Sequence, residues 1–140
     1  MNFLTIEDFK QVCDDQTLAV INQQSEDNLS RAEKYAIEEM SSYLRSKYDV
    51  EKAFSSIGDE RNPQIVMYCC DITLYHLIAW LPKRIGFEIR DIRYKRSIEW
   101  LEQVQNSKAS PNLPLLTDES SGQPVSNFRY GSWQKNNYEY

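Results

Sequence analysis

The residues with the most reactive side chains in this sequence are one histidine and three cysteines. His76 follows Cys69 by seven residues on the same face of a predicted helix. A Cys–His nucleophile pair needs hydrogen-bond contact, but seven helical residues rise by roughly 10 Å. Zinc requires about four converging ligands, whereas Cys69, Cys70 and His76 point in different directions. We therefore expect no metal site, and we interpret His76 as a core or interface residue.

Adjacent carboxylates occur at Asp14–Asp15, Glu38–Glu39 and Asp59–Glu60. Neighbouring helical residues diverge by about 100°, so Glu38 and Glu39 do not converge on one substrate. Acid–base catalysis also requires a carboxyl group in an apolar pocket, and no sequence signal indicates one. The chain has four glycines and lacks the phosphate-loop, G-x-S-x-G and H-E-x-x-H motifs. We expect no catalytic residues, no enzyme activity and no cofactor.

The composition fits one helical domain with appendages. The chain has 140 residues, of which 41% are hydrophobic and 26% charged, as in ordinary globular proteins. Three cysteines, two of them adjacent, do not form a disulfide framework and fit a reducing compartment. The N-terminus does not resemble a signal peptide, and the longest apolar run is interrupted by Asp71 and His76. We expect no membrane span.

Helical periodicity and capping residues predict an all-α fold, with about three long helices and one or two short N-terminal helices. Thr5 and Asp8 predict a capping box at the first short helix, and a second spans Gln16 to Ile21. The predicted long helices run from Asn28 or Ser30 to near Tyr48, from Pro63 to about Leu81, and from about Gly86 to Asn106, with a connection at 49–62. Glu33, Lys34, Glu38 and Glu39 are expected to face away from the apolar stripe of the first long helix.

The two later long helices have unusual apolar patterns. The helix after Pro63 is apolar on nearly every face, which is typical of a central buried helix. The last helix has two apolar faces. Phe87, Tyr94, Ile98 and Leu101 form the expected core stripe, and the opposite face carries the candidate subunit-interface residues Ile85, Ile89, Ile92, Arg96 and Trp100. That second face contacts a partner, or else a loop or the tail of the same chain covers it.

From residue 108 the helical period is lost, so we divide the chain into a helical domain at 1–107 and an extended polar and aromatic tail at 108–140. Polar tails are usually poor in aromatic residues. This one ends with the candidate docking residues Phe128, Tyr130, Trp133, Tyr138 and Tyr140. Aromatic anchors on an extended segment are typical of a chain that docks on another surface.

Charge is distributed unevenly along the chain, whose net charge is -5. Residues 1–60 carry 13 acidic and 6 basic groups, and residues 83–96 carry 6 basic and 2 acidic groups. Opposite charges at two ends could attract between copies, although a solvated helix face with local ion pairs is the simpler interpretation. Phe87 and Tyr94 within the basic segment lie on the predicted core stripe, poorly placed to stack on bases. We therefore do not expect specific DNA binding.

The order of these segments resembles the Mu-type bacteriophage head–tail connector, or neck, proteins. The similarity spans roughly residues 1–117. It is carried by Thr5–Phe9, by Ala36 with Tyr43–Leu44 and Lys47–Asp49, by Cys70–Ile72 with Tyr75 and Leu77, and by Arg93–Tyr94, Ile98, Trp100–Leu101, Val104 and Leu113–Leu115. This chain departs from the family at Asp49–Val50, where a proline is common, and at Ser107–Lys108, where a glycine is common.

The resemblance implies a structural subunit of the virion that assembles in the host cytoplasm as a homo-oligomeric ring. Such a ring joins the portal to tail or adaptor proteins, and DNA only passes through its lumen. An alternative function is a small helical interaction or regulatory module without enzyme activity. The mass of the particle in solution, alone and with portal protein, separates the two.

Overall fold

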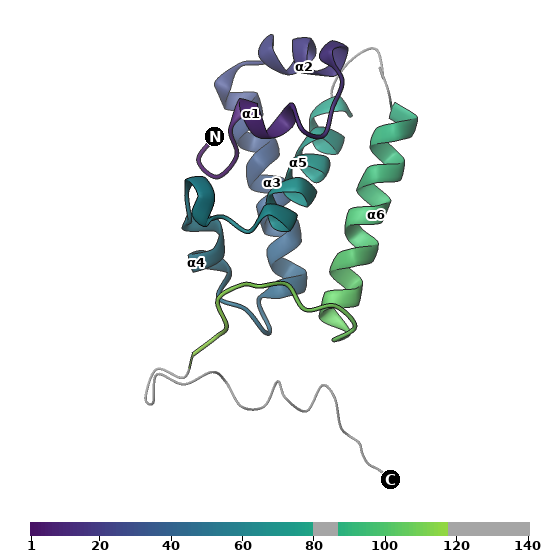
Figure 1. Cartoon of the computed structure of the whole chain (residues 1–140). Coiled ribbons are helices and arrows are strands. Elements are labelled where there is room, and N and C mark those ends of the chain that lie inside the picture. Colours follow the sequence, from purple (N-terminus) through teal and green to yellow (C-terminus); the bar gives the residue numbers. More distant parts are fainter. Residues whose placement is uncertain (80–86, 118–140) are drawn as a thin grey trace.

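The computed structural model describes residues 1–79 and 87–117, which form helices and no strands apart from one isolated bridge. The elements are α1 (Ile6–Phe9), α2 (Asp15–Asn22), α3 (Glu26–Leu44), α4 (Val50–Ser55), the 3-10 turn η1 (Gly58–Glu60), α5 (Pro63–Ile78) and α6 (Phe87–Gln105). The helices α3, α5 and α6 run side by side, α1 and α2 lie at one end, and α4 lies at the flank (Figure 1). The predicted all-α bundle is confirmed.

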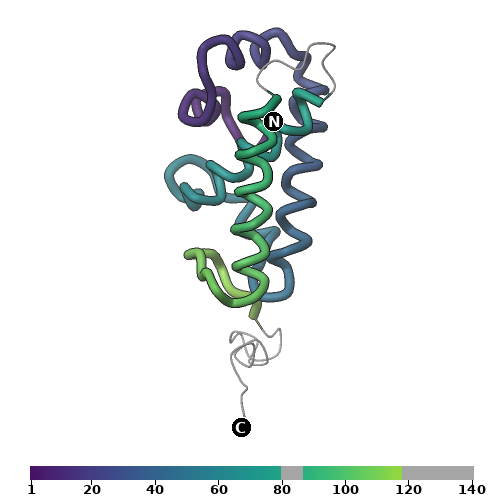
Figure 2. Tube along the Cα trace, turned by 90° about the vertical axis from the view of Figure 1, so that its right-hand side faces the viewer, coloured from purple at the N-terminus to yellow at the C-terminus, as the bar shows by residue number. Residues whose placement is uncertain are grey.

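The central helix of the bundle is α5. Asn62 caps it by accepting the N–H groups of Gln64 and Ile65 at 2.9 and 3.1 Å, and Pro63 occupies its first turn. Ten of its sixteen residues are buried, and both α3 and α6 pack along it, while α1 covers part of it. Fully burying one Leu or Ile side chain contributes about 1.5–3 kcal/mol. The bundle is elongated along the common direction of α3, α5 and α6 (Figure 2).

The helix α3 begins at Glu26 with Ser25 as its cap and ends at Leu44, earlier at both ends than the sequence predicted. Ala32 and Ala36 are fully buried, and their small side chains allow α5 to approach closely. The predicted connection at 49–62 contains two further elements. Asp49 accepts the N–H of Lys52 at 3.0 Å and so caps α4, and η1 follows it.

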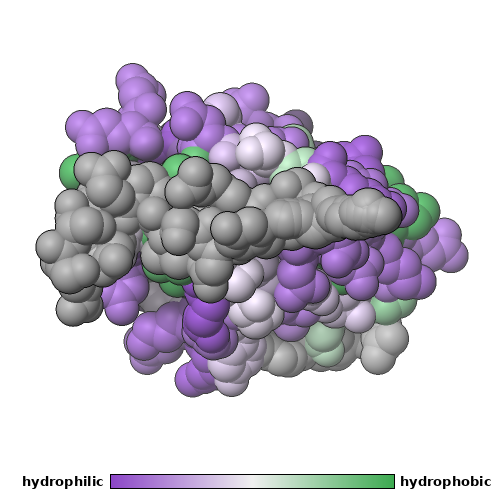
Figure 3. Space-filling model, turned by 90° about the horizontal axis from the view of Figure 1, so that it is seen from below, coloured by the Kyte–Doolittle hydropathy of each residue, from purple (hydrophilic) through white to green (hydrophobic). Residues whose placement is uncertain are grey.

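Residues 107–117 return beneath the bundle. Ser107 adopts a left-handed backbone with φ of 63°, the conformation that glycine takes at helix ends. Asp49 donates its N–H to Pro114 O at 2.8 Å, Leu116 donates to Lys47 O at 3.2 Å, and Tyr48 pairs with Leu115. The packed chain therefore continues past residue 107 to Leu116. Seen from below, the described surface is mostly hydrophilic (Figure 3).

Glu33 on α3 is buried rather than outward-facing, which corrects the prediction from sequence. Only 3% of the surface of Glu33 is exposed to solvent. The two carboxylate oxygens accept the N–H groups of Asn2, Phe3 and Leu4 at 2.9, 3.0 and 2.6 Å. One carboxylate thus satisfies three backbone donors, two of which, on Phe3 and Leu4, would otherwise be buried without partners, and it fixes the N-terminal segment against α3.

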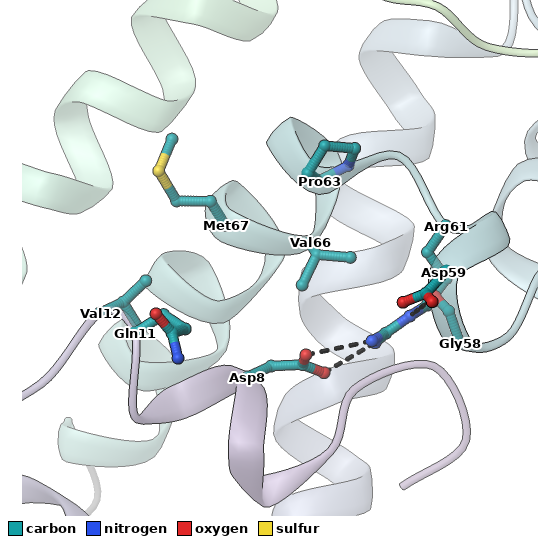
Figure 4. Close-up of a pocket in the computed structure, with 9 residues that line it drawn as sticks. All are labelled: Asp8, Gln11, Val12, Gly58, Asp59, Arg61, Pro63, Val66 and Met67. Carbon is teal, nitrogen blue, oxygen red and sulfur yellow. Dashed lines mark hydrogen bonds and ion pairs between the residues drawn. The ribbon is translucent and has the colours of Figure 1, made fainter.

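A second contact holds α1 in place. Arg61, just before α5, donates through Nη1 and Nη2 to the carboxylate of Asp8 at 2.7 and 3.1 Å, and through Nη1 to Phe3 O at 2.7 Å. Figure 4 shows this pair. Asp8 also closes the predicted capping box with Thr5, which is confirmed. Burial raises the pKa of Asp8, but the Arg61 and Thr5 hydrogen bonds outweigh it and hold that pKa below its usual value.

We expect Glu33→Gln to lower the free energy of unfolding by about 1–3 kcal/mol, because an amide offers one acceptor oxygen and leaves a buried N–H unpaired. Urea denaturation followed by circular dichroism measures the change. Glu38→Gln on the same helix is the control. Glu38 is exposed and, among the described residues, forms an ion pair with Arg45 alone, so its loss should cost less than about 0.5 kcal/mol. Equal stability of Glu33→Gln and wild type would contradict the anchoring role.

The Asp8–Arg61 pair predicts a stability loss in acid. Because the folded pKa of Asp8 lies below its unfolded value, the ionised carboxyl stabilises the fold above about pH 4, and this contribution is lost as the pH falls through the folded pKa. Asp8→Asn lacks the charge at every pH. Its stability deficit relative to wild type should therefore shrink between about pH 5 and pH 2. A deficit that is constant over this range would contradict the prediction.

Candidate functional site

The core-facing side of α6 changes from polar to apolar residues along the helix. Near its C-terminal end, Leu101 and Val104 are fully buried. Nearer its N-terminal end the same side carries Arg90 and Ser97, which are 5% and 0% exposed. These buried positions are separated by three, four or seven residues, as one helical face requires. The core side of α6 is therefore polar in its first half and apolar in its second.

The residues of the core stripe predicted for this helix are buried to different degrees. Leu101 is fully buried, and Tyr94 and Ile98 are half-buried and pack against the core. Phe87 is half-buried, with its ring centroid 6.3 Å from that of Tyr75. The most deeply buried side of α6 also includes Arg90 and Ser97, which the apolar pattern did not predict.

Arg90 and Arg93 meet a carboxylate in the middle of α5. Asp71 is fully buried and accepts a hydrogen bond from Arg93 Nε at 2.7 Å. Arg90 Nη1 lies 3.9 Å from the same oxygen, and Arg90 Nη2 donates to Val12 O at 3.3 Å. Burial raises the pKa of Asp71, while the Arg93 hydrogen bond and both guanidinium charges act in the opposite direction. This cluster aligns α6 with α5 and with the segment after α1.

His76 belongs to a polar and aromatic seam between the three long helices. Its Nε2 lies 3.0 Å from Glu39 Oε1 on α3, and Tyr94 of α6 donates its hydroxyl to the other oxygen of Glu39. Tyr75 stacks on Tyr94 with centroids 3.9 Å apart. Burial raises the pKa of Glu39, but the hydrogen bonds from His76 and Tyr94 outweigh it and lower that pKa. Glu39, which the sequence placed on the outer face, thus joins all three helices.

The cysteines are held in their thiol form by burial. Cys69 and Cys70 are fully buried, and burial raises the pKa of each thiol far above its usual value. Cys13 is half-buried, and its Sγ donates to Phe9 O at 3.0 Å. Across residues 1–79 and 87–117, no three His, Cys, Asp or Glu side chains are grouped so that they could hold a metal ion. Nor is any helix in these ranges long and apolar enough to cross a bilayer.

The candidate interface residues on α6 have different environments. Ile89 is 49% exposed, Ile92 is 61% exposed and Arg96 is exposed. Trp100 is 9% exposed, because it stacks on Tyr68 of α5 with centroids 4.7 Å apart. Ile85 lies outside the described residues. The solvent-facing part of the predicted face is therefore the group Ile89, Ile92 and Arg96, which we call the α6 strip.

A second surface feature was not predicted from the sequence. A hollow of about 440 Å³ opens between α1, η1 and the first turns of α5 (Figure 4). Val66 and Met67 give it an apolar wall, and the Asp8–Arg61 pair and Asp59 give it a charged rim. Beside it, Ile57 is 71% exposed. An isoleucine directly before Gly58-Asp59-Glu60 was the available sequence signal, since an isolated apolar residue in a polar turn has no core to enter.

The candidate docking residues of the tail lie outside the described residues. They are Phe128, Tyr130, Trp133, Tyr138 and Tyr140. Their docking role therefore stays a prediction, as does the division of the chain at residue 107.

The comparison with protein families connects this helical bundle to phage proteins. The family described as "Bacteriophage Mu, Gp36" matches residues 3–127, which is most of the chain. Neither the curated proteins nor the solved structures gave a match. The matched range contains every helix of the bundle, the α6 strip and the η1 turn. This chain belongs to the bacteriophage Mu Gp36 family of phage proteins.

Proposed function

We propose that this chain is a structural subunit of the virion that forms a ring between the portal and the tail, as a head–tail connector or neck protein. Membership of a phage family supports the setting. The observation that carries the assembly role is the α6 strip. Ile89 and Ile92 remain largely in solvent beside Arg96, although the bundle has a full core without them. Exposed apolar patches with a polar rim mark interaction sites, and we interpret the α6 strip as such a patch.

The charge distribution supports a contact that repeats from head to tail. Residues 1–60 have an excess of acidic groups, 13 against 6 basic, and residues 83–96 have an excess of basic groups, 6 against 2 acidic. A surface that contacts a different surface of the next copy generates rings when the rotation closes. In this proposal the ring contacts the portal on one side and tail or adaptor proteins on the other, and DNA only passes through its lumen. The net acidic charge of the chain disfavours binding to DNA phosphates.

The proposal assigns the chain no catalytic activity and no cofactor, and places it in the virion after assembly in the host cytoplasm. The second candidate is a small helical interaction or regulatory module, since a single partner could also cover the α6 strip. Light scattering of the chain alone and with portal protein distinguishes them. A ring mass, or a stable complex with portal, supports the connector. A strict monomer that binds neither portal nor tail proteins favours the regulatory module.

We expect Ile92→Asp, and likewise Ile89→Asp, to leave the monomer folded and to weaken assembly. Each side chain is exposed in the monomer, so the free energy of unfolding should change by less than about 0.5 kcal/mol, whereas a carboxylate in a closed interface is costly. Thermal unfolding and light scattering provide the two measurements. Ala19→Asp, which adds a carboxylate at another exposed position, is the control. Unfolding of the Ile92→Asp monomer would assign this side chain to the core instead.

Removal of residues 124–140 should preserve the helical thermal transition and reduce assembly. The core described for residues 1–79 and 87–117 extends from Phe3 to Val104, and we expect this packing to remain when the segment is removed. Circular dichroism tests the fold, and sedimentation with and without portal protein tests assembly. Loss of the thermal transition in the truncated chain would refute a docking role for the tail.

A further inference from the structure

We propose that the α6 strip of one copy binds the η1 turn of the next copy. The binding group on that turn consists of Ile57, Asp59 and Glu60, which we call the η1 knob. The inference rests on the proposed ring function and names the two surfaces that form its subunit contact. Three observations support it, namely the exposure of both groups, the sign of their charges and their places on the bundle.

The η1 knob is the most exposed apolar site on the described surface. Ile57 is 71% exposed, more than the other large hydrophobic residues of residues 1–79 and 87–117. It is followed by Gly58, which has a φ of 60°, and outside its own chain neighbours no atom lies within 4 Å of the position where a Cβ would be. The solvent-facing side of the turn therefore leaves room for another chain to approach it.

The charges beside the two apolar groups are opposite in sign, and none of them forms an ion pair within the described residues. Asp59 and Glu60 are exposed and form no ion pair with any described residue. On α6, Arg93 pairs with Asp71 and Lys95 pairs with Asp91 at 2.9 Å. Arg96 is exposed and has no such pair within the described part of the chain. Each surface thus combines isoleucine with an exposed charge that forms no close ion pair there, and the two signs are complementary.

The two groups lie on different parts of the bundle. The α4–η1 region is at one edge of the molecule and α6 is at the other edge (Figure 1), and the view along the perpendicular direction also separates them (Figure 2). The strip and the knob of one copy therefore cannot bind each other. Contact between strip and knob is heterologous and repeats in one direction, as a ring requires.

Crosslinking between two labelled populations tests the pairing directly. One population carries Ile57→Cys and the other Ile92→Cys, both with Cys13→Ser, since Cys69 and Cys70 are buried. A short bismaleimide should crosslink the mixed pair at least about fivefold more than either population alone. Ser42→Cys, at an exposed position on α3, serves as the control partner for each. Crosslinks that are no more frequent for the mixed pair than for this control overturn the proposal.

Charge exchange provides a second, independent test. Arg96→Glu alone, or Asp59→Arg with Glu60→Arg, should weaken assembly by more than about tenfold, because like charges then oppose each other. All three substitutions in one chain should restore assembly to within about threefold of wild type. Circular dichroism confirms that each monomer is folded. Failure of the combined variant to recover overturns the strip-to-knob pairing.

The outcome for the wild-type chain separates this inference from the function on which it rests. If wild-type rings form but neither test detects the pairing, the ring function stands and the contact lies elsewhere. If wild type remains monomeric alone and with portal protein, the ring function fails, and this contact fails with it.

Discussion

The structure depends on one constraint, which is that α5 is apolar on nearly every side. Ten of its sixteen residues are buried, so most of the helix must be covered by other elements, while Val66 and Met67 line the hollow beside α1. The flanking helices α3 and α6 cover two sides, and α1 with the N-terminal segment covers part of a third. Fully buried alanines at Ala32 and Ala36 keep α3 close to it. The arrangement of the other elements follows from the need to cover this one helix.

Carboxylates determine which faces of the covering elements meet. Glu33 holds the N-terminal segment through three backbone N–H groups, Asp71 holds α6 through Arg93, and Glu39 joins His76 to Tyr94. Such groups add little net stability compared with a well-packed apolar residue, but loss of either partner leaves a buried charge. They therefore disfavour alternative registers of the helices more than they strengthen the packing.

Among the buried polar side chains, Asp71 Oδ2, Thr73 Oγ1 and Arg90 Nε and Nη1 form no hydrogen bond with the described residues. These atoms are enclosed, so it is the exposed apolar groups that carry information about partners. Two exposed groups contain isoleucine next to a charged side chain, on α6 and at η1. A phage family protein with two such surfaces of opposite charge is suited to repeated contact between copies. The proposed connector function uses these exterior surfaces, and the interior of the bundle serves to hold them at fixed positions.

The sequence alone determined the class of the fold, the order of the helices and several of their ends. These features are local, since Thr5 with Asp8 and Asn62 with Pro63 act on backbone groups only a few residues away. It also predicted that Ile89 and Ile92 lie on a face apart from the core. Tertiary structure alone decided that Glu33 is buried, that Arg90 and Ser97 occupy the core side of α6, and that Trp100 packs on Tyr68. The physical reason is that a charged or aromatic side chain is buried when a partner from a distant segment of the chain contacts it. The periodicity of one helix does not predict which distant residue that partner is.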